Sequence, residues 1–174
     1  MGLVTDRTAP TACWLHPAVE VRGSAIEGRG LFAGEPIGAD QAVSRLGGLM
    51  ATDDELATMF GESPGYIDTI SVSRGTNLVL PPGVPNRFGN HSCDPNLWWA
   101  DAFTLAMRRD IDTGEELTND YGTCTDDATF RMDCRCGSVR CRDPVTGRDW
   151  QLPGLQQRYG KHWVPVLLER IADR

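Results

Sequence analysis

The chain has 174 residues, of which 40% are hydrophobic and 24% are charged. Because about 100 to 200 residues usually form one domain, this length and composition predict a single folded domain and exclude extended disorder. The formal net charge of −7 argues against a nucleic-acid-binding surface, since such surfaces gather Lys and Arg to neutralise phosphates.

The sequence gives no sign of a membrane segment or an export signal. No apolar run approaches the roughly 20 residues that cross a bilayer, and residues 1–17 have neither a basic start nor an apolar stretch. We therefore expect an intracellular, cytoplasmic protein. Its acidic body would attract basic peptides, although acidity serves solubility equally well.

Taken in chain order, the predicted elements are mostly short strands. Alternating apolar and polar residues predict an edge strand over 18–22, and the glycine-rich stretch 23–37 is typical of a strand with turns rather than a helix. Further strands are predicted over 41–46, 66–72, 76–80, 98–100 and 103–108, the last two as a hairpin near Asp101.

Two helices are predicted among these strands. Thr52 and Glu55 have the spacing of a capping box, ahead of a helix that ends by Gly61. Apolar residues recur at helical spacing over 164–171, and a proline is tolerated in the first turn there. The whole pattern predicts a mainly β fold of small sheets, with a few short helices and a terminal helix over the domain.

The most informative stretch is RFGNHSCDPN at 87–96, which puts a cysteine, a histidine and two asparagines into one proline-stiffened turn. Taken alone, Asn90 and His91 would more often cap local backbone groups than bind a ligand. A second polar stretch, GEELTNDYG at 114–122, carries Tyr121. A tyrosine in such a turn is, in isolation, more often a core residue. Each motif alone therefore leaves a structural role open.

The six cysteines allow either three disulfides or a metal site. Cys134 and Cys136 are separated by one residue, so a disulfide between them would be strained, whereas both sulfurs can bind one ion. Cys141 is a third thiol in the same stretch, and Cys93 can supply the fourth. The spacing predicts a closed, structural four-thiolate zinc site with no position left for water.

The stretch GRGLFA at 28–33 precedes these two motifs, and the pattern CxCxxxxC at 134–141 follows them. In this combination and order the chain resembles the SET-domain protein lysine methyltransferases over residues 19–141. The resemblance implies a fold of small β-sheets in which the two polar motifs form a threaded pseudoknot. Ordinary rules of chain connection do not predict such a topology.

The resemblance also divides the chain. It implies a SET domain over 17–123 with a variable insert over about 50–85, followed over 124–174 by a zinc-binding post-SET segment and the terminal helix. We find no cysteine-rich segment before the SET core and no chromatin-reading domain. The chain is therefore expected to be a minimal, stand-alone enzyme.

In the family the methyl donor is S-adenosylmethionine, and the resemblance assigns its binding to matching positions here. The expected contacts are the backbone of Arg29, Gly30 and Leu31, the side chain of Asn90, the backbone of His91 and, stacked on adenine, Trp150. Ordinary packing would explain Trp150 equally well. Without the resemblance, the glycine pair at 28 and 30 would indicate only a tight turn.

The resemblance makes Tyr121 the catalytic residue. Methyl transfer to lysine needs a neutral amine, and neutralising a side chain of pKa about 10.4 at pH 7 costs on the order of 4 to 5 kcal/mol. A narrow apolar channel beside the positively charged sulfonium lowers that cost, because desolvation and like charge both disfavour the ammonium. The tyrosine hydroxyl would then orient the amine for attack.

Asn119 departs from the family pattern, in which Phe or Tyr commonly stands two residues before the catalytic tyrosine. A polar amide there can hold a water near the amine and change how many methyl groups are added. The departure keeps an alternative open, a catalytically inactive SET-fold module that zinc stabilises and that binds other proteins. An enzyme with a catalytic metal is disfavoured, because four thiolates saturate the ion.

The expected partner is a lysine-containing, basic protein substrate, with no direct nucleic acid or membrane partner. Its peptide would meet the insert and the C-terminal tail, in the family often as an added strand. Aromatic residues for which we weigh a place in the channel against core packing are Trp98, Trp99, Phe103 and Phe130. Tyr66 lies in the variable insert, which in the family usually presents substrate. Small buried thiols are expected at Cys13 and Cys124.

Overall fold

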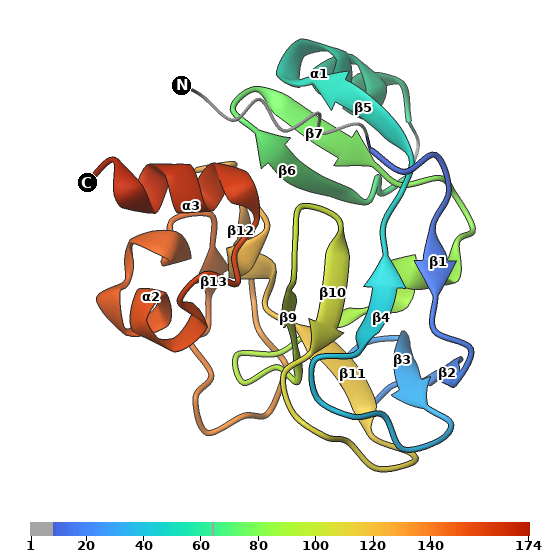
Figure 1. The fold of residues 1–174 in the computed structure, drawn as a ribbon. Helices are drawn as coiled ribbons and strands as arrows, with labels where there is room; N and C mark the ends of the chain where they lie inside the picture. The colour runs from blue at the N-terminus through green and yellow to red at the C-terminus, as the bar shows by residue number, and fades with distance from the viewer. Residues whose placement is uncertain (1–8, 64) are drawn as a thin grey trace, which may run out of the picture.

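The computed structural model describes residues 9–63 and 65–174. Within these ranges the chain forms four small sheets and three short α-helices (Figure 1), which confirms the mainly β fold. None of the helices in the described ranges is long and apolar enough to cross a membrane. The prediction that residues 1–17 carry no export signal falls partly on residues outside these ranges.

Two four-stranded sheets form the body of the protein, with strand orders β1-β4-β10-β9 and β2-β3-β11-β8. β8 and β11 run parallel, whereas the other neighbours in these sheets are antiparallel. The strands are β1 (Trp14–Leu15), β2 (Val19–Gly23), β3 (Arg29–Ala33), β4 (Ala42–Arg45), β8 (Asn90–His91), β9 (Leu97–Trp99), β10 (Thr104–Met107) and β11 (Glu116–Asn119).

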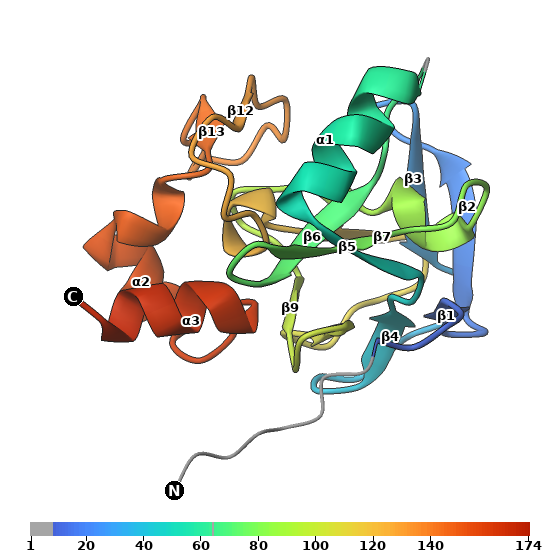
Figure 2. The ribbon, with the colours of Figure 1, turned by 90° about the horizontal axis from the view of Figure 1, so that it is seen from above.

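The insert forms a separate three-stranded sheet and one helix. Its strands, in the order β5-β7-β6, are β5 (Leu49–Thr52), β7 (Thr76–Val79) and β6 (Thr69–Ser73), and α1 (Asp53–Glu62) follows β5. Seen from above, α1 lies along this sheet (Figure 2). The capping box is confirmed, since Thr52 Oγ1 accepts from the Glu55 N–H at 3.3 Å and the Glu55 carboxylate accepts from the Thr52 N–H at 2.8 Å.

The predicted hairpin is also confirmed. β9 and β10 pair antiparallel, and the Asp101 carboxylate accepts from the N–H groups of Phe103 and Thr104, each at 2.8 Å. These two bonds hold the turn, because an aspartate side chain can take the place of a backbone acceptor there.

The C-terminal region contains two helices where one was predicted. α2 (Pro153–Tyr159) ends at Gly160, whose φ of +53° is a conformation that glycine tolerates better than other residues. α3 (Pro165–Ala172) then begins with Pro165 in its first turn, as predicted. The remaining elements are β12 (Arg131–Met132), β13 (Val145–Thr146) and three 3₁₀ turns, η1 (Pro85–Phe88), η2 (Tyr121–Thr123) and η3 (Asp149–Gln151).

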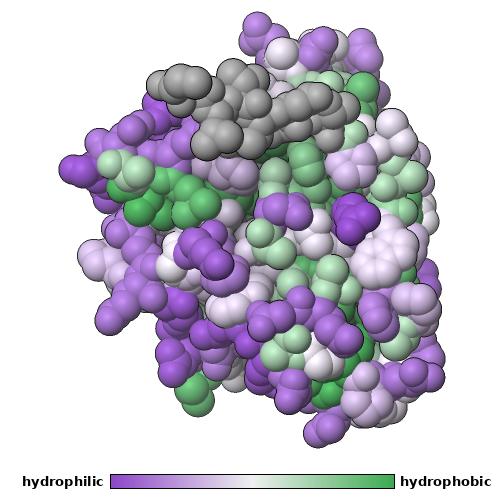
Figure 3. All heavy atoms as spheres, in the orientation of Figure 1, coloured by the Kyte–Doolittle hydropathy of each residue, from purple (hydrophilic) through white to green (hydrophobic). Residues whose placement is uncertain are grey.

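One continuous hydrophobic cluster joins the sheets to the C-terminal helices. Burial of this apolar surface is the main force that holds the elements together. Its most deeply buried side chains include Leu31, Val43, Leu78, Leu97, Trp99, Met107, Leu117, Trp163 and Leu167. The face seen in Figure 3 is mainly hydrophilic, with hydrophobic side chains gathered over α3.

Candidate active site and metal centre

The two polar motifs meet in the middle of the protein. Asn90 pairs with Thr118 and His91 with Asn119 in the parallel ladder of β8 and β11. The Asn96 side chain reinforces this pairing, because it donates to the Glu116 carbonyl at 2.8 Å and accepts from the Thr118 N–H at 2.9 Å. Asn96 is therefore a scaffold residue, and the motifs share one site.

A carboxylate that the sequence analysis did not single out anchors Asn90. The Asn90 amide donates to Glu116 Oε1 at 2.8 Å and to the carbonyls of Glu27 at 3.2 Å and Arg29 at 3.0 Å. Ser24 donates to the same carboxylate at 2.8 Å. The only sequence signal for Glu116 was its place in β11 two residues from Thr118, since such residues share a face of the strand.

Gly30 has a steric reason to be glycine. A Cβ at this position would lie 2.2 Å from Glu116 Oε1, so any other residue would push the carboxylate away from Asn90. Arg29 and Leu31, on either side of it in β3, line a cavity. The Arg29 guanidinium lies 4.6 Å from the centre of the Phe88 ring, a cation–π contact that holds the side chain in place.

The cavity has a volume of about 1200 Å³ and brings the predicted site residues together. Arg29, Leu31, Asn90, His91 and Tyr121 all line it. Such a volume exceeds the roughly 300 to 1,000 Å³ of a typical small-molecule site, which leaves space for a second molecule. Additional lining comes from the insert at Leu56, Phe60, Tyr66 and Asp68 and from the post-SET segment at Phe130, Met132 and Arg135.

Tyr121 is held by its own backbone turn and by a carbonyl across the cavity. Asp120 caps η2 by accepting from the Gly122 N–H at 3.0 Å, and the Tyr121 hydroxyl donates to the Gly89 carbonyl at 2.8 Å. Burial is the main factor that raises the pKa of Tyr121 above its usual value. The phenol therefore stays protonated at neutral pH, with oxygen lone pairs left to accept a hydrogen bond.

His91 connects Tyr121 to the cysteines. Its Nδ1 accepts from the Tyr121 N–H at 3.1 Å, and its Nε2 lies 3.3 Å from Cys93 Sγ. Burial lowers the pKa of His91 to about 4, so the imidazole is neutral at pH 7. Because Nδ1 accepts a hydrogen bond, the ring proton is on Nε2 and points to the sulfur.

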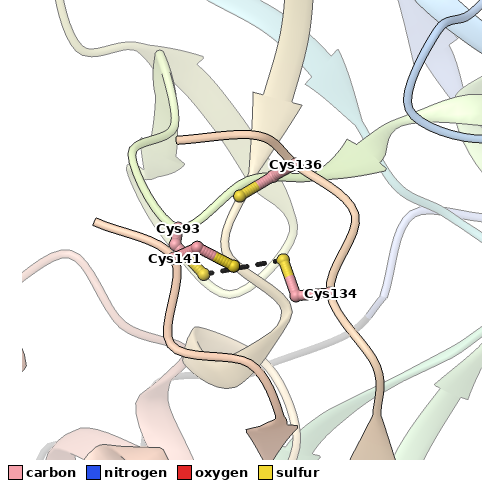
Figure 4. Close-up of side chains that lie close together, drawn as sticks. All are labelled: Cys93, Cys134, Cys136 and Cys141. Carbon is pink, nitrogen blue, oxygen red and sulfur yellow. Dashed lines mark hydrogen bonds between the residues drawn. The ribbon is translucent and has the colours of Figure 1, made fainter. Parts of the chain in front are cut away.

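The four predicted metal ligands converge, as Figure 4 shows. The Sγ atoms of Cys93, Cys134, Cys136 and Cys141 all lie within 4.8 Å of one another, and those of Cys93 and Cys134 are 3.7 Å apart. Tetrahedral zinc with Zn–S bonds of about 2.3 Å needs sulfurs roughly 3.8 Å apart. The donor set and its spacing therefore fit zinc.

All six cysteines lie in the described residues, and none forms a disulfide. Cys124 is buried beside Tyr121, where it donates to the Tyr121 carbonyl at 3.4 Å, and burial raises its pKa to about 12. Cys13 is partly buried and exchanges hydrogen bonds with the backbone of Gly47. Cys124 fits the expectation of a small buried thiol, whereas Cys13 fits it only in part.

Two predicted cofactor contacts are not among the residues that line the cavity, Gly30 in β3 and Trp150. The Trp150 side chain is buried in the core and lies under the guanidinium groups of Arg170 and Arg174. Three of the other aromatic candidates do line the cavity, namely Trp99, Phe130 and Tyr66. Phe103 belongs to the core cluster, and Trp98 stacks on His162.

Comparison with known proteins gives a consistent result. The SET domain family matches residues 28–122, more than half of the 174-residue chain. Human histone-lysine N-methyltransferase 2B is 36% identical over 141 residues, which cover 72% of this chain and 5% of that protein. The probable histone-lysine N-methyltransferase set-23 of Caenorhabditis briggsae is 32% identical over 136 residues, which cover 67% of this chain and 55% of that protein.

The chain thus spans only part of the length of these relatives. Among solved structures, the methyltransferase domain of human histone-lysine N-methyltransferase SETMAR superposes with a TM-score of 0.59 at 23% identity, over 76% of this chain and 58% of that one. This likeness concerns the fold alone.

Proposed function

Because the chain belongs to the SET-domain family, we propose that it transfers a methyl group from S-adenosylmethionine to the side-chain amine of a lysine in a protein. The observation that carries the proposal is that Arg29, Asn90 and Tyr121 line the same cavity. The relatives' names support a histone-lysine activity. We propose a basic, lysine-containing protein as substrate, with histones as the first candidates.

The donor would lie against β3 and β8. We propose that the backbone of Arg29 to Leu31 and of His91 contacts it, while the Asn90 amide is oriented by Glu116. When bound, the sulfonium supplies an electrophilic methyl group. The Glu116 carboxylate also holds negative charge near the site of a donor whose sulfonium, ammonium and carboxylate sum to a net charge of +1, which favours binding electrostatically.

The lysine would enter from the side of the insert and meet the Tyr121 hydroxyl. That hydroxyl is fixed by its bond to the Gly89 carbonyl, so its remaining lone pairs can accept from the amine and aim it at the donor. A half-buried, protonated phenol is a poor base. Its contribution is therefore orientation, and loss of the lysine proton follows from desolvation beside a cation.

The four cysteines would hold zinc as a structural ion. Four thiolates fill a tetrahedral set, so the ion would offer no position to substrate. Its effect would be to fasten residues 134–141 to Cys93 in the turn that also carries Asn90 and His91. The post-SET segment would thereby complete the cavity wall that Phe130 and Arg135 form.

The alternative is an inactive SET-fold module, and one observation supports it. Asn119 lines the cavity as a buried amide at the position where the family commonly has an aromatic ring. Retention of Asn90, His91 and Tyr121 in one cavity favours the enzyme. Donor binding and turnover separate the two possibilities, because an inactive module needs neither.

The test combines calorimetry with radiolabel transfer. The purified protein is titrated with S-adenosylmethionine and then incubated with methyl-labelled donor and histones or a cell lysate, followed by mass spectrometry of labelled bands. Lys161 is the only lysine in the chain, so Lys161→Arg removes side-chain self-labelling on lysine as a background. We expect micromolar donor binding and label on lysine of a basic protein.

Tyr121→Phe is the matched catalytic control, since it removes only the hydroxyl. Loss of that one positioned contact should reduce turnover about 100-fold while donor affinity changes little. Donor binding without any labelled protein would favour the inactive module. Label confined to nucleic acid or small molecules would overturn the substrate assignment.

A further inference from the structure

A buried ion network joins the post-SET segment to the turn that carries Tyr121. The Arg142 guanidinium donates to both oxygens of Asp120, at 2.7 and 2.6 Å, and its Nε donates to Asp149 at 2.9 Å. The side chains of Asp120, Asp149 and Arg142 are only 1%, 7% and 13% exposed. Charges this deeply buried persist because they pair with one another.

The same residue also contacts the thiolate cluster. Arg142 directly follows Cys141, and its backbone N–H donates to Cys93 Sγ at 3.3 Å. Backbone N–H bonds to a ligand sulfur orient that ligand and influence how it binds the ion. Arg142 therefore touches the candidate metal centre with its backbone and the Asp120 turn with its side chain.

Asp120 connects the ion network to the turn that carries Tyr121. Its Oδ1 accepts from the Gly122 N–H at 3.0 Å, and its Oδ2 accepts from the Tyr159 hydroxyl at 2.8 Å. Its backbone carbonyl accepts from the Thr123 hydroxyl at 2.6 Å. The carboxylate thus closes the 3₁₀ turn that begins with Tyr121, so a shift of Asp120 would move the phenol.

His91 provides a second route between the same two places. Its imidazole bridges Cys93 Sγ and the Tyr121 N–H, at 3.3 and 3.1 Å. Arg158 adds a bond to the Cys93 carbonyl at 2.8 Å. Two parallel connections over so short a distance make the cluster and the turn one rigid unit.

We propose that Arg142 is a positioning residue that transmits the geometry of the thiolate centre to the turn carrying Tyr121. The inference rests on the proposed function for its catalytic meaning, whereas the coupling itself is a property of the fold. A metal ion would fix Cys93 and Cys141, Arg142 would follow them, and Asp120 would hold η2 in place. Arginine suits this role because its rigid, planar guanidinium bonds both oxygens of Asp120 and one of Asp149 in a fixed geometry, which the compact ammonium of lysine does not provide.

The test compares Arg142→Lys with Arg140→Lys. Both variants keep the charge and add one lysine, and both positions lie in the post-SET loop. Arg140 is 55% exposed in its side chain and lies 3.8 Å from Asp94, away from the buried network. Cobalt substitution reports on the metal site through its thiolate absorption, hydrogen exchange reports on residues 119–124, and steady-state kinetics separate kcat from the KM of the donor.

In Arg142→Lys we expect one bound cobalt with an unchanged spectrum, about tenfold faster exchange over 119–124, and about a tenfold lower kcat at an unchanged donor KM. Arg140→Lys should match the wild type in all four readouts. Exchange over 119–124 as slow as in Arg140→Lys would overturn the proposal, whatever the kinetics show.

A second measurement covers the case in which Arg142→Lys does not fold. The wild-type protein is stripped of metal by a chelator, and exchange over 119–124 is compared with exchange over β4, which has no hydrogen bond to that segment among the described contacts. The proposal requires faster exchange in the turn and little change in the strand, and equal exchange with and without metal would overturn it. This readout needs no turnover, so an inactive wild type would refute the proposed function and leave the coupling to be judged separately.

Discussion

The two walls of the cavity are built differently. The post-SET wall is tied to the Tyr121 turn by buried charges, with Asp120 1% and Arg142 13% exposed in their side chains. The insert wall rests on α1, a helix with no buried residue, and it exposes Phe60 by 48% and Tyr66 by 76%. Several buried polar contacts hold the post-SET wall in place, whereas the insert wall presents apolar side chains with few partners.

This difference suggests a division of labour. Chemistry needs reacting groups held within a fraction of an ångström, which a network of buried bonds provides. Substrate choice needs surface that a peptide can cover, which exposed aromatic residues provide at little cost to the fold. We therefore expect changes in the post-SET wall to affect turnover and changes in the insert wall to affect substrate affinity.

The largest effect should come from breaking the post-SET wall at Cys134. Cys134→Ser leaves three thiolates, so zinc content should fall and turnover should drop about 100-fold. The insert sheet and core do not depend on this residue, so the far-ultraviolet circular dichroism spectrum should change little. Metal analysis and turnover measure the effect, with Cys13→Ser as the control at a cysteine outside the cluster. Full activity without metal would contradict the division of labour.

Breaking the insert wall should raise the KM of the substrate instead. Phe60→Ala removes an exposed ring that lines the cavity, and we expect about a fivefold higher KM, close to 1 kcal/mol of lost apolar contact. The kcat, zinc content and donor affinity should stay at wild-type values. Leu49→Ala is the control, because Leu49 is a 60% exposed apolar residue of the insert that does not line the cavity. Equal KM values for the two variants would argue against a binding role for Phe60.

Asn119, between the two walls, allows a test of how many methyl groups are added. This buried amide lies near Gly89, with its Oδ1 3.6 Å from the position that a Cβ on Gly89 would take. Asn119→Phe would replace the amide and any water it holds with a ring, so we expect a shift in the mono-, di- and trimethyl distribution at less than threefold change in the total rate. Mass spectrometry of a product peptide measures it, and an unchanged distribution would show that Asn119 does not set product multiplicity.

The smallest effect concerns the protonation of His91. A model histidine titrates near 6.5, whereas burial lowers the pKa of His91 to about 4. The unfolded chain therefore binds a proton that the folded chain excludes, and the contribution of His91 to stability is lost as pH falls from 6.5 toward 4. An NMR titration should show flat His91 ring resonances between pH 8 and 5.5. A midpoint near 6.5 would mean that His91 is not buried as a neutral bridge to Cys93.

Sequence patterns predicted those parts of the fold whose signal is local. The capping box at Thr52 and the Asp101 hairpin both depend on groups within three residues of each other, and both are present. The cysteine spacing predicted a shared metal site for the same reason, with Cys93 as the one distant member. The separate helix α2 was missed, because its seven residues bury only Leu155 and Tyr159, which is too few for a periodic apolar signal.

The sequence singled out residues of the candidate site but not the groups that hold them in place. Asn90, His91 and Tyr121 stood out because they lie in compact motifs, and the structure brings them to one cavity. Trp150 was chosen as the first aromatic residue after Cys141 in the sequence, yet its side chain packs into the core. Glu116 was passed over, since its place two residues from Thr118 does not distinguish it from other carboxylates in an acidic chain until its partners are known.

By itself the sequence determined the family, the motifs and the four thiols, because each is a short run of residues whose chemistry is visible without the fold. Only the tertiary structure decided that Arg142 and Tyr159, which are 22 and 39 positions from Asp120, meet on its carboxylate. The physical reason is that a buried ion pair between distant residues has no periodicity and no composition of its own. It exists only where packing removes water and brings the charges together.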